Sequence, residues 1–323
     1  MRAALYDQFG PIENMRIADL PSPRAGKGQV VVRVKAAGVS FPDVLTIQKK
    51  YQVIPDLPFS PGGEVSGVVT EVGEDVTQFR VGDAVFGGAR NACREEVVAE
   101  AARLWPMPPG LDPLVAAGFG MNYATSWYAL KYRGELKAGE TLLVLGASGG
   151  VGLAAVDIGK RLGARVIACA STAEKLAACK TAGADELINY TTEDLREAVK
   201  RLTGGRGIDV CYDPVGDKYA EPMVRSMAWG GRYLVIGFAA GDIPKIALNL
   251  PLLKGSAIVG VFLGGLMNAD PLRGREIYAE LIGEVAAGRL KPLISASYPL
   301  ERTVEALQAM ATRKVLGKVV VTP

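Results

Sequence analysis

A glycine-rich turn at residues 146–152 has the residue types and spacing most typical of ligand binding in this chain. It follows an apolar run at 142–145 and precedes 151–162, where apolar residues recur at helical spacing. A second apolar strand is expected at 165–170. Glycine permits close approach of the backbone to a ligand, and a helix N-terminus favours an anion. This order of elements predicts a dinucleotide-binding turn, the alternative being a purely structural turn.

The turn departs from the usual G-x-G-x-x-G pattern in two ways. Its first glycine is replaced by Ala147, so the motif runs Ala147-x-Gly149-x-x-Gly152. The acidic residue expected about 20 positions further on is missing, and Ser171 stands there with Lys175 close behind. A carboxylate would repel a ribose 2′-phosphate, whereas a hydroxyl and an ammonium attract it. The pair predicts NADP(H), unless Lys175 is an ordinary solvated lysine.

The composition limits the chemistry that the side chains can perform. The chain has 323 residues, a formal net charge of +3, four cysteines and no histidine. Without histidine there is no Ser-His or Cys-His nucleophile and no histidine-ligated metal. The chemistry must therefore come from a cofactor, from Tyr, Lys, Asp or Glu, or from bound water.

The same composition indicates a globular protein of about two domains. Acidic and basic residues are interspersed, so we expect no nucleic-acid partner. No cysteines form a C-x-x-C pair, so each is expected to be a buried or incidental thiol. The sequence has no signal-peptide pattern and no apolar run of 18 residues, so we expect a cytoplasmic protein without a membrane partner.

The elements that position these residues fall into two parts. Residues 1–120 are rich in short β-branched runs with Gly and Pro between them, which predicts a barrel-like β unit with one helix at 41–49. From 141 to 262 strands and helices alternate, which predicts a parallel sheet covered on both faces. The further helices are expected at 113–119, 122–132, 173–182, 192–202, 217–228, 271–288 and 301–311, and the further strands at 186–189, 208–212, 232–237, 256–262, 295–298 and 316–321.

The strand expected at 256–262 is long and apolar. At the edge of a sheet it would invite pairing with another chain, and a symmetric homodimer with edge-to-edge sheets satisfies it. The alternative is burial of this strand within one subunit.

Several motifs occur together in chain order. They are Ala36-Ala37-Gly38-Val39, Pro42-Asp43-Val44-Leu45, Pro58-Phe59, Gly63-Glu64-x-x-Gly67, Val81-Gly82-Asp83-x-Val85-Phe86, the 147–152 turn, Gly183-Ala184-Asp185, Ile188-Asn189-Tyr190 and Gly317-Lys318-Val319-Val320. Over essentially the whole chain they resemble the medium-chain dehydrogenases/reductases, specifically the zinc-free quinone oxidoreductase (ζ-crystallin-like) branch. The resemblance implies an α/β fold with a GroES-like β-barrel catalytic domain at 1–122 and 263–323. A Rossmann dinucleotide-binding domain at 123–262 completes the implied fold, with a cleft between the two domains.

The resemblance also implies that this chain works without zinc. In zinc-dependent relatives a histidine stands at the position of Gly63, a cysteine near Ser40, and a third ligand near Met121. None of these residues is a histidine or a cysteine here. We therefore expect no metal.

The activity implied is NADPH-dependent reduction of quinones or other α,β-unsaturated carbonyl compounds by direct hydride transfer. The protein must then orient the nicotinamide, stabilise an oxyanion and supply a proton to a small electrophilic substrate. An alternative in the same class is reduction of acryloyl-CoA, another enoyl thioester or a 2-alkenoate. An alternative of another class is a non-catalytic NADPH-binding protein.

Tyr51 is the candidate catalytic residue. It follows the expected helix at 41–49, and related enoyl and quinone reductases keep a tyrosine at this spacing. Its hydroxyl would donate a proton to a carbanion or hold the carbonyl oxygen. The alternative is that Tyr51 packs the rim or contacts the cofactor while water supplies the proton.

The remaining expected contacts to the cofactor are carried over by position from the resemblance. Thr125 is expected at the nicotinamide amide, Tyr190 with Lys175 at the adenosine phosphate, and Arg313 at the cofactor phosphates. Phe238 and Phe262 are as plausible as core aromatics. The full expected set is Ser40, Thr125, Ala147, Ser148, Gly149, Gly150, Val151, Gly152, Ser171, Lys175, Tyr190, Gly237, Phe238, Phe262, Leu263 and Arg313.

Overall fold

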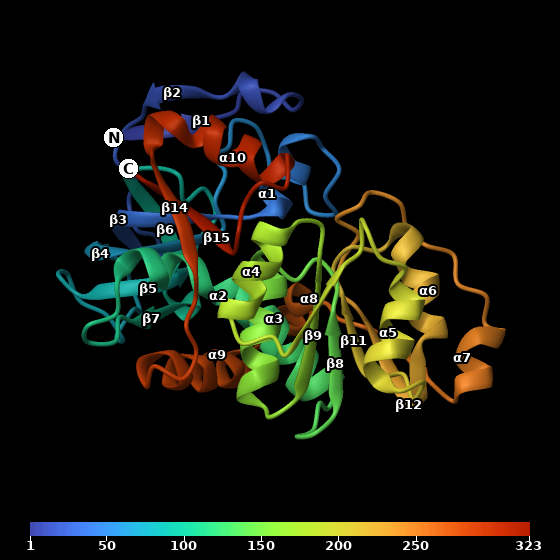
Figure 1. Cartoon of the computed structure of the whole chain (residues 1–323). Helices are drawn as coiled ribbons and strands as arrows, with labels where there is room; N and C mark the ends of the chain where they lie inside the picture. Colours follow the sequence, from blue (N-terminus) through green and yellow to red (C-terminus); the bar gives the residue numbers. More distant parts are fainter. The chain divides into compact units, whose positions relative to one another are not determined.

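The computed structural model describes residues 1–323, which divide into two compact units (Figure 1). The first unit comprises Met1–Met121 and Pro292–Pro323, and the second comprises Asn122–Lys291. The chain therefore leaves the first unit once and returns to it near its C-terminus.

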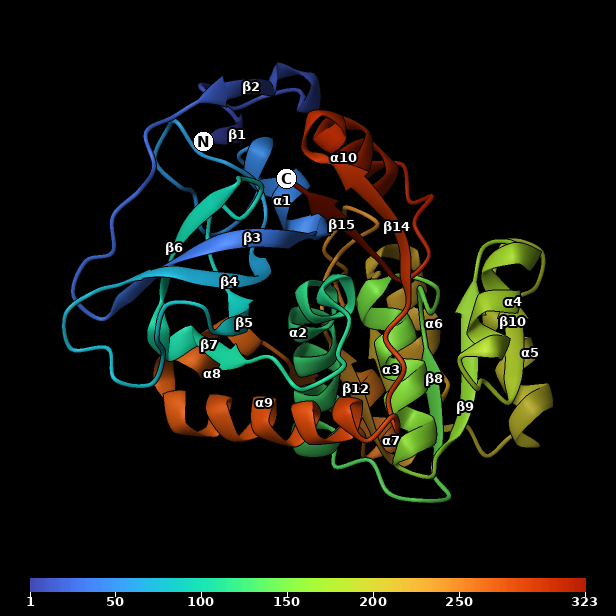
Figure 2. The ribbon, with the colours of Figure 1, turned by 90° about the vertical axis from the view of Figure 1, so that its left-hand side faces the viewer.

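The first unit is built around a seven-stranded sheet. Its strands follow the order β14-β15-β3-β4-β5-β7, with β6 paired to β3, and β1 and β2 form a separate two-stranded sheet. Strand β15 pairs antiparallel with β3 and parallel with β14, so segments from both ends of the chain share one sheet (Figure 2). The elements are β1 (Arg2–Leu5), β2 (Arg16–Asp19), β3 (Gln29–Val39), α1 (Phe41–Ile47), β4 (Glu64–Val72), β5 (Ala84–Gly88), β6 (Glu96–Glu100), β7 (Leu104–Pro106), β14 (Ile294–Pro299), α10 (Thr303–Ala311) and β15 (Lys318–Thr322).

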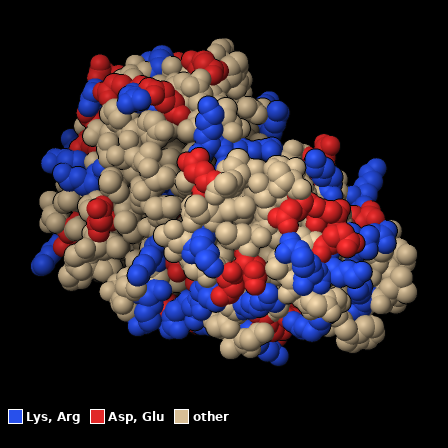
Figure 3. Space-filling model, in the orientation of Figure 1, with Lys and Arg blue, Asp and Glu red and all other residues tan.

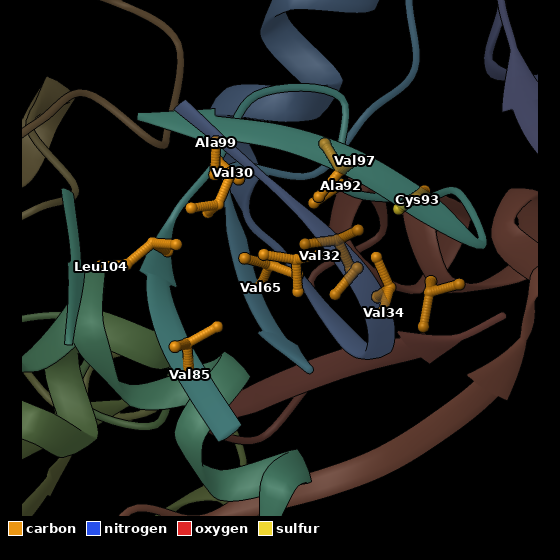
Figure 4. Close-up of a cluster of buried hydrophobic side chains, with 14 of the residues drawn as sticks. Val30, Val32, Val34, Val65, Val85, Ala92, Cys93, Val97, Ala99 and Leu104 are labelled. Carbon is orange, nitrogen blue, oxygen red and sulfur yellow. The ribbon is translucent and has the colours of Figure 1, made fainter. Parts of the chain in front are cut away.

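Valines from neighbouring strands form the core of this unit (Figure 4). Val30, Val32 and Val34 of β3 pack with Val65 of β4 and Val85 of β5, and all five are buried. Residues two apart on a strand point to the same face, so this spacing directs the three β3 side chains into one cluster. The packed sheet gives a rigid support to the segment that directly follows β3.

The second unit contains a six-stranded, entirely parallel sheet. Its order is β10-β9-β8-β11-β12-β13, so in chain order the strands lie 3-2-1-4-5-6. Ligands of such sheets bind beyond the carboxyl ends of the strands where the order reverses, here between β8 and β11. The elements are β8 (Thr141–Val144), α3 (Gly150–Arg161), β9 (Arg165–Ala170), α4 (Ala173–Thr181), β10 (Glu186–Asn189), α5 (Leu195–Thr203), β11 (Ile208–Asp213), α6 (Ala220–Arg225), β12 (Met227–Val235), α7 (Asn249–Lys254), β13 (Ala257–Gly260), α8 (Leu263–Ala269) and α9 (Pro271–Ala286).

Helices cover both faces of this sheet. A Cβ on Gly159 of α3 would lie 2.5 Å from Leu142, so α3 packs closely on that face. The neighbouring Leu143 clusters instead with Val199 of α5 and Met223 of α6. Consecutive strand residues point to opposite faces, so the sheet is doubly wound, as the alternation of elements predicted.

The crossover helix α2 (Pro113–Trp127) differs from the sequence prediction. Two helices were expected at 113–119 and 122–132, but one helix continues into a π-helical segment, Tyr128–Arg133. Glycine weakens a helical pattern, but here Gly118 serves close packing, since its Cβ would lie 2.4 Å from Ile294. Helices α7 and α8 were not predicted, and β13 is shorter than the expected strand at 256–262.

Residues 263–291 belong to the second unit, not to the first as the family resemblance implied. Helix α9 is tied to this unit by Glu280, which accepts hydrogen bonds from Trp127 Nε1 at 2.7 Å and Lys131 Nζ at 2.8 Å. Glu284 pairs with Arg161 at 2.6 Å. These side-chain pairings join residues far apart in the chain, so a local sequence pattern does not predict them.

The surface and the thiols agree with the expectations from composition. Both acidic and basic side chains are spread over the face in Figure 3, with broad uncharged areas between them. All four cysteines are buried and unpaired with one another. None of the helices has the length and apolar character that crossing a bilayer requires.

Candidate functional site

The glycine-rich turn connects β8 to the N-terminus of α3. Gly146 adopts a left-handed φ of +55°, and the Ala147 N–H donates to the Cys169 carbonyl of β9 at 3.0 Å. Gly149 is the N-cap residue of α3, so the N–H groups of the first helical turn have no partner within the helix. The turn therefore presents backbone donors at the carboxyl end of β8.

Two glycines allow this turn to close tightly. A Cβ on Gly152 would lie 2.3 Å from the Gly146 carbonyl oxygen and 2.8 Å from Ala147 Cα. A Cβ on Gly150 would lie 2.5 Å from Asn122 Nδ2. The donors and the absence of side chains fit a dinucleotide pyrophosphate lying against the backbone. The predicted residues 147–152 thus form one continuous segment, which comprises the turn and the first residues of α3.

Ser171 and Lys175 lie side by side just beyond β9. Thr172 is the N-cap of α4, and its side chain accepts from the Lys175 N–H at 3.3 Å. This cap places Lys175 in the first turn of α4, where its Nζ donates to Ser171 Oγ at 3.3 Å. The structure therefore brings together the hydroxyl and the ammonium that the sequence analysis predicted to act as a pair. Serine occupies the position after β9 at which an acidic residue is usual.

Tyr190 lies at the end of the neighbouring strand β10. Its N–H donates to the Ala170 carbonyl at 3.2 Å, and its ring lies 4.9 Å from the ring of Tyr219. The sequence did not point to Tyr219, because the two tyrosines are 29 positions apart by their residue numbers and no local pattern links them.

The other expected residues of the second unit lie outside regular strands. Thr125 is a partly exposed residue of α2, whose next residue, Ser126, donates to the Val151 carbonyl at 2.9 Å. The predicted strand at 232–237 ends two residues early at Val235, so the expected pair Gly237 and Phe238 follows it.

Two aromatic residues in this unit had an alternative assignment as core residues. Phe238 is 38% exposed and Phe262 is 58% exposed, so neither is part of the core. Phe262 was expected in the last strand but is the N-cap of α8, and Leu263 begins that helix. Both aromatic side chains are therefore accessible to a ligand.

The expected residues of the first unit are Ser40, Tyr51 and Arg313. Tyr51 lies in the loop after α1 and is partly buried. Burial, followed by the nearby Asp43 carboxylate, raises the pKa of its phenol, which stays protonated at neutral pH. Arg313 follows α10 with a φ of +57° and is exposed.

Ser40 belongs to a buried polar network at the end of β3. Lys318 Nζ donates to Ser40 Oγ at 2.6 Å and to Glu64 Oε2 at 2.7 Å, and the Met121 N–H donates to Glu64 Oε1 at 2.6 Å. A Cβ on Gly63 would lie 3.3 Å from Met121 Cε. The three positions that the resemblance assigns to metal ligands thus gather around a lysine–glutamate ion pair. The structure contains no cluster of His, Cys, Asp or Glu side chains arranged to hold a metal ion.

Lys318 is part of the C-terminal motif Gly317-Lys318-Val319-Val320, and the sequence alone indicates no role for it. The signal available in the sequence was a lysine at the head of an apolar strand, before Val319, Val320 and Val321. Such a lysine is almost never fully buried unless it is paired. Its partner could not be named without the fold.

Comparison with known proteins identifies relatives across most of the chain. Residues 26–125 match the alcohol dehydrogenase GroES-like domain, and residues 150–284 match the zinc-binding dehydrogenase model. A quinone oxidoreductase-like protein 2 homolog of Nematostella vectensis is 40% identical over 300 residues, covering 92% of this chain and 82% of the relative.

Two solved structures have the same fold over the full length. A mycobacterial protein complexed with NADPH superimposes with a TM-score of 0.92 at 32% identity, covering 100% of each chain. The Escherichia coli quinone oxidoreductase complexed with NADPH superimposes with a TM-score of 0.93 at 27% identity, again covering 100% of each chain.

Proposed function

We infer the function from the family, since the chain belongs to the quinone oxidoreductase branch of the medium-chain dehydrogenases/reductases. It is an oxidoreductase with a GroES-like unit and a Rossmann unit. We propose that it uses NADPH to reduce quinones or other α,β-unsaturated carbonyl compounds without a metal. The observation that carries the cofactor is the pair Ser171 and Lys175 beyond β9, where NAD-specific sheets of this kind have an acidic residue.

In this proposal the turn at 147–152 holds the pyrophosphate, and Ser171 with Lys175 holds the 2′-phosphate. NADPH, when bound, supplies a hydride. Thr125, Phe262 and Leu263 are assigned to the nicotinamide, and Tyr190 with Arg313 to the phosphates. The protein's own chemical task is to orient the substrate, exclude water and deliver a proton.

We assign proton delivery to Tyr51. Its phenol has a pKa raised first by burial and then by Asp43, so the donor form is present throughout the neutral range. A hydroxyl in this form donates to a carbonyl oxygen or to a carbanion.

Stopped-flow measurement of NADPH oxidation tests this proposal. We expect turnover with benzoquinones or enones, and slower turnover with acryloyl-CoA. Faster turnover with acryloyl-CoA would favour the thioester alternative. NADPH binding without turnover of any of these electrophiles would favour a non-catalytic NADPH-binding protein.

Replacing Lys175 by alanine should reduce the preference for NADPH over NADH. Loss of a charge-assisted contact of about 1.5–3 kcal/mol corresponds to roughly a 10- to 100-fold change. Fluorescence titration with both cofactors measures it. Lys180, which lies in the last turn of the same helix and donates to the Asp185 carbonyl at 3.2 Å, provides the control Lys180→Ala. An unchanged NADPH/NADH ratio in Lys175→Ala would remove Lys175 from the phosphate site.

We further propose a homodimer formed through β13. Strand β13 is the last strand at one edge of the parallel sheet, and Ile258 on it is 40% exposed. On the neighbouring β12, Trp229 is 82% exposed. An edge strand with exposed apolar side chains favours pairing with a second copy.

An Ile258→Asp variant should therefore be a monomer at concentrations where the wild type is a dimer. In the dimer the new carboxylate would be buried without a partner, which destabilises the interface. The twofold symmetry places one such carboxylate on each subunit, so this cost occurs twice. Light scattering coupled to gel filtration measures the mass. The control is Val81→Asp, which changes an exposed valine of the first unit. A dimeric Ile258→Asp protein would place the interface elsewhere.

A further inference from the structure

The buried ion pair between Lys318 and Glu64 is not used by the function proposed so far. The Lys318 side chain is 3% exposed and that of Glu64 is 6% exposed, with a separation of 2.7 Å. Removing two charges from water is costly, and a well-packed apolar pair at such a site is often as stable. Stability alone is therefore a weak explanation for this pair.

The ammonium is also bonded to a hydroxyl. Lys318 Nζ lies 2.6 Å from Ser40 Oγ, and an ammonium can only donate, so Ser40 Oγ is the acceptor. The hydroxyl proton of Ser40 is not used in this bond and remains available for another acceptor. A hydroxyl whose oxygen accepts from a cation is polarised and becomes a stronger donor.

The backbone of Ser40 is fixed as well. Its N–H donates to Asp43 Oδ2 at 2.7 Å, while Asp43 Oδ1 accepts from the Gly62 N–H at 2.9 Å. The same Asp43 is near enough to Tyr51 to raise the pKa of its phenol, after the effect of burial. One partly buried carboxylate in the first unit thus holds the backbone of Ser40 and also acts on the phenol of Tyr51.

We propose that Ser40 is a catalytic hydrogen-bond donor to the substrate oxygen that becomes negatively charged on reduction, and that Lys318 is the residue that positions and polarises it. This inference rests on the proposed reduction of a conjugated carbonyl compound. Hydride addition brings two electrons to the acceptor, whose π electrons move onto the carbonyl oxygen. Ser40 and Lys318 keep their protons, and the proton that completes the reduction comes from Tyr51 or water. Preorganised donors of this kind act where charge develops in the transition state.

The proposal gives a reason for the location of the ion pair. Ser40, Gly63 and Met121 are the positions at which the resemblance places metal ligands in zinc-dependent relatives. The positive charge next to Ser40 is here the Lys318 ammonium, held by Glu64. An ammonium that acts through a hydroxyl stabilises an oxyanion less directly than a metal ion bound to that oxyanion. Both nevertheless place a positive charge near the same group of residues.

Kinetics of Ser40 and Lys318 variants with NADPH and 1,4-benzoquinone form the first arm of the test. We expect Ser40→Ala, which leaves the ion pair intact, to lower kcat about 100-fold, the lower end of what one oxyanion donor contributes. The dissociation constant for NADPH should stay within about twofold, since the contact forms only as charge develops. Lys318→Met should lower kcat in the wild type but by less than about threefold in the Ser40→Ala background, because Lys318 acts through Ser40. Lys318→Arg should restore most of the loss.

An exposed lysine on the same segment provides the matched control. Lys314→Met should leave kcat unchanged. Equal effects of Lys318→Met in both backgrounds would show a purely structural role and overturn the positioning claim. If Lys318→Met does not fold, as circular dichroism would show, Ser40→Ala alone decides, and an unchanged kcat in it overturns the proposal.

The second arm uses binding without turnover. 4-Nitrophenolate mimics the product oxyanion, and nitrobenzene has the same ring without the charge. We expect Ser40→Ala to weaken nitrophenolate binding about tenfold and to leave nitrobenzene binding unchanged, as measured by calorimetry. Equal changes for both probes would overturn the donor role. A different result is a wild type that binds nitrophenolate more tightly than nitrobenzene and yet fails to oxidise NADPH with any of the electrophiles. That result would overturn the proposed function, but it would support the oxyanion site.

Discussion

A Gly152→Val variant is expected to bind NADPH at least about 100-fold more weakly than the wild type. Its Cβ would lie 2.3 Å from the Gly146 carbonyl oxygen, and both atoms belong to the turn that presents the phosphate-binding N–H groups. Backbone atoms cannot rotate away as a flexible side chain can, so the turn must open. A displacement of about 1 Å in a positioning element is enough for a 100-fold loss, which is about 2.7 kcal/mol. Fluorescence titration with NADPH measures the change.

The matched control is Gly283→Val in α9. No atom lies within 4 Å of the Cβ that this substitution adds, so NADPH affinity should be unchanged. Thermal melting separates loss of binding from loss of folding. A folded Gly152→Val protein with wild-type affinity for NADPH would show that the turn is not the phosphate site.

The turn was predictable because its constraints are local. Ala147, Gly149 and Gly152 lie within six residues, between a strand and a helix whose apolar periods differ clearly in the sequence. The pairing of Ser171 with Lys175 is also local, since only four positions separate them and Thr172 between them caps the helix that carries Lys175. The parallel order of the sheet followed from the alternation of strands and helices.

The polar network around Ser40 was not predictable in the same way. Lys318 is separated from Ser40 by 278 positions and from Glu64 by 254 positions, and they come together because β15 and β4 both pair with β3. Antiparallel pairing of Val319 with Val39 places the neighbouring residues of both strands at the same sheet end. A sequence pattern identifies strands, but it does not state which strands pair.

The expected boundary between the two units differs from the observed one for a related reason. The family resemblance assigned residues 263–323, and with them α9, to the first unit, whereas Glu280 and Glu284 attach α9 to Trp127 and Arg161. Those contacts span 153 and 123 positions. Specific side-chain pairs of this kind decide where a surface helix packs, and local hydrophobic periodicity does not record them.

A Tyr51→Phe variant should lose most of its activity with substrates that need a proton on carbon. General acid catalysis contributes about 10²- to 10⁴-fold, and an enone must gain its proton at a carbon that exchanges slowly with water. We therefore expect kcat with an enone to fall about 100-fold or more. With a benzoquinone the new charge is on oxygen, which water protonates readily, so kcat should fall less than about tenfold. Steady-state kinetics with both substrates measure the difference.

If Tyr51 donates the proton, kcat of the enone reaction should fall at alkaline pH. The pKa of Tyr51 is raised by burial first and then by Asp43, so the phenol is the donor at every pH below this raised value. Wild-type kcat should hence be level through the neutral range and fall only above the ordinary tyrosine pKa of about 10. Tyr51→Phe should lack this alkaline fall, whereas Tyr298→Phe, which changes a ring packed under Arg302, should keep it. A Tyr51→Phe protein with wild-type kcat for both substrates would assign the proton to water, and Tyr51 would then be a packing residue of the loop after α1.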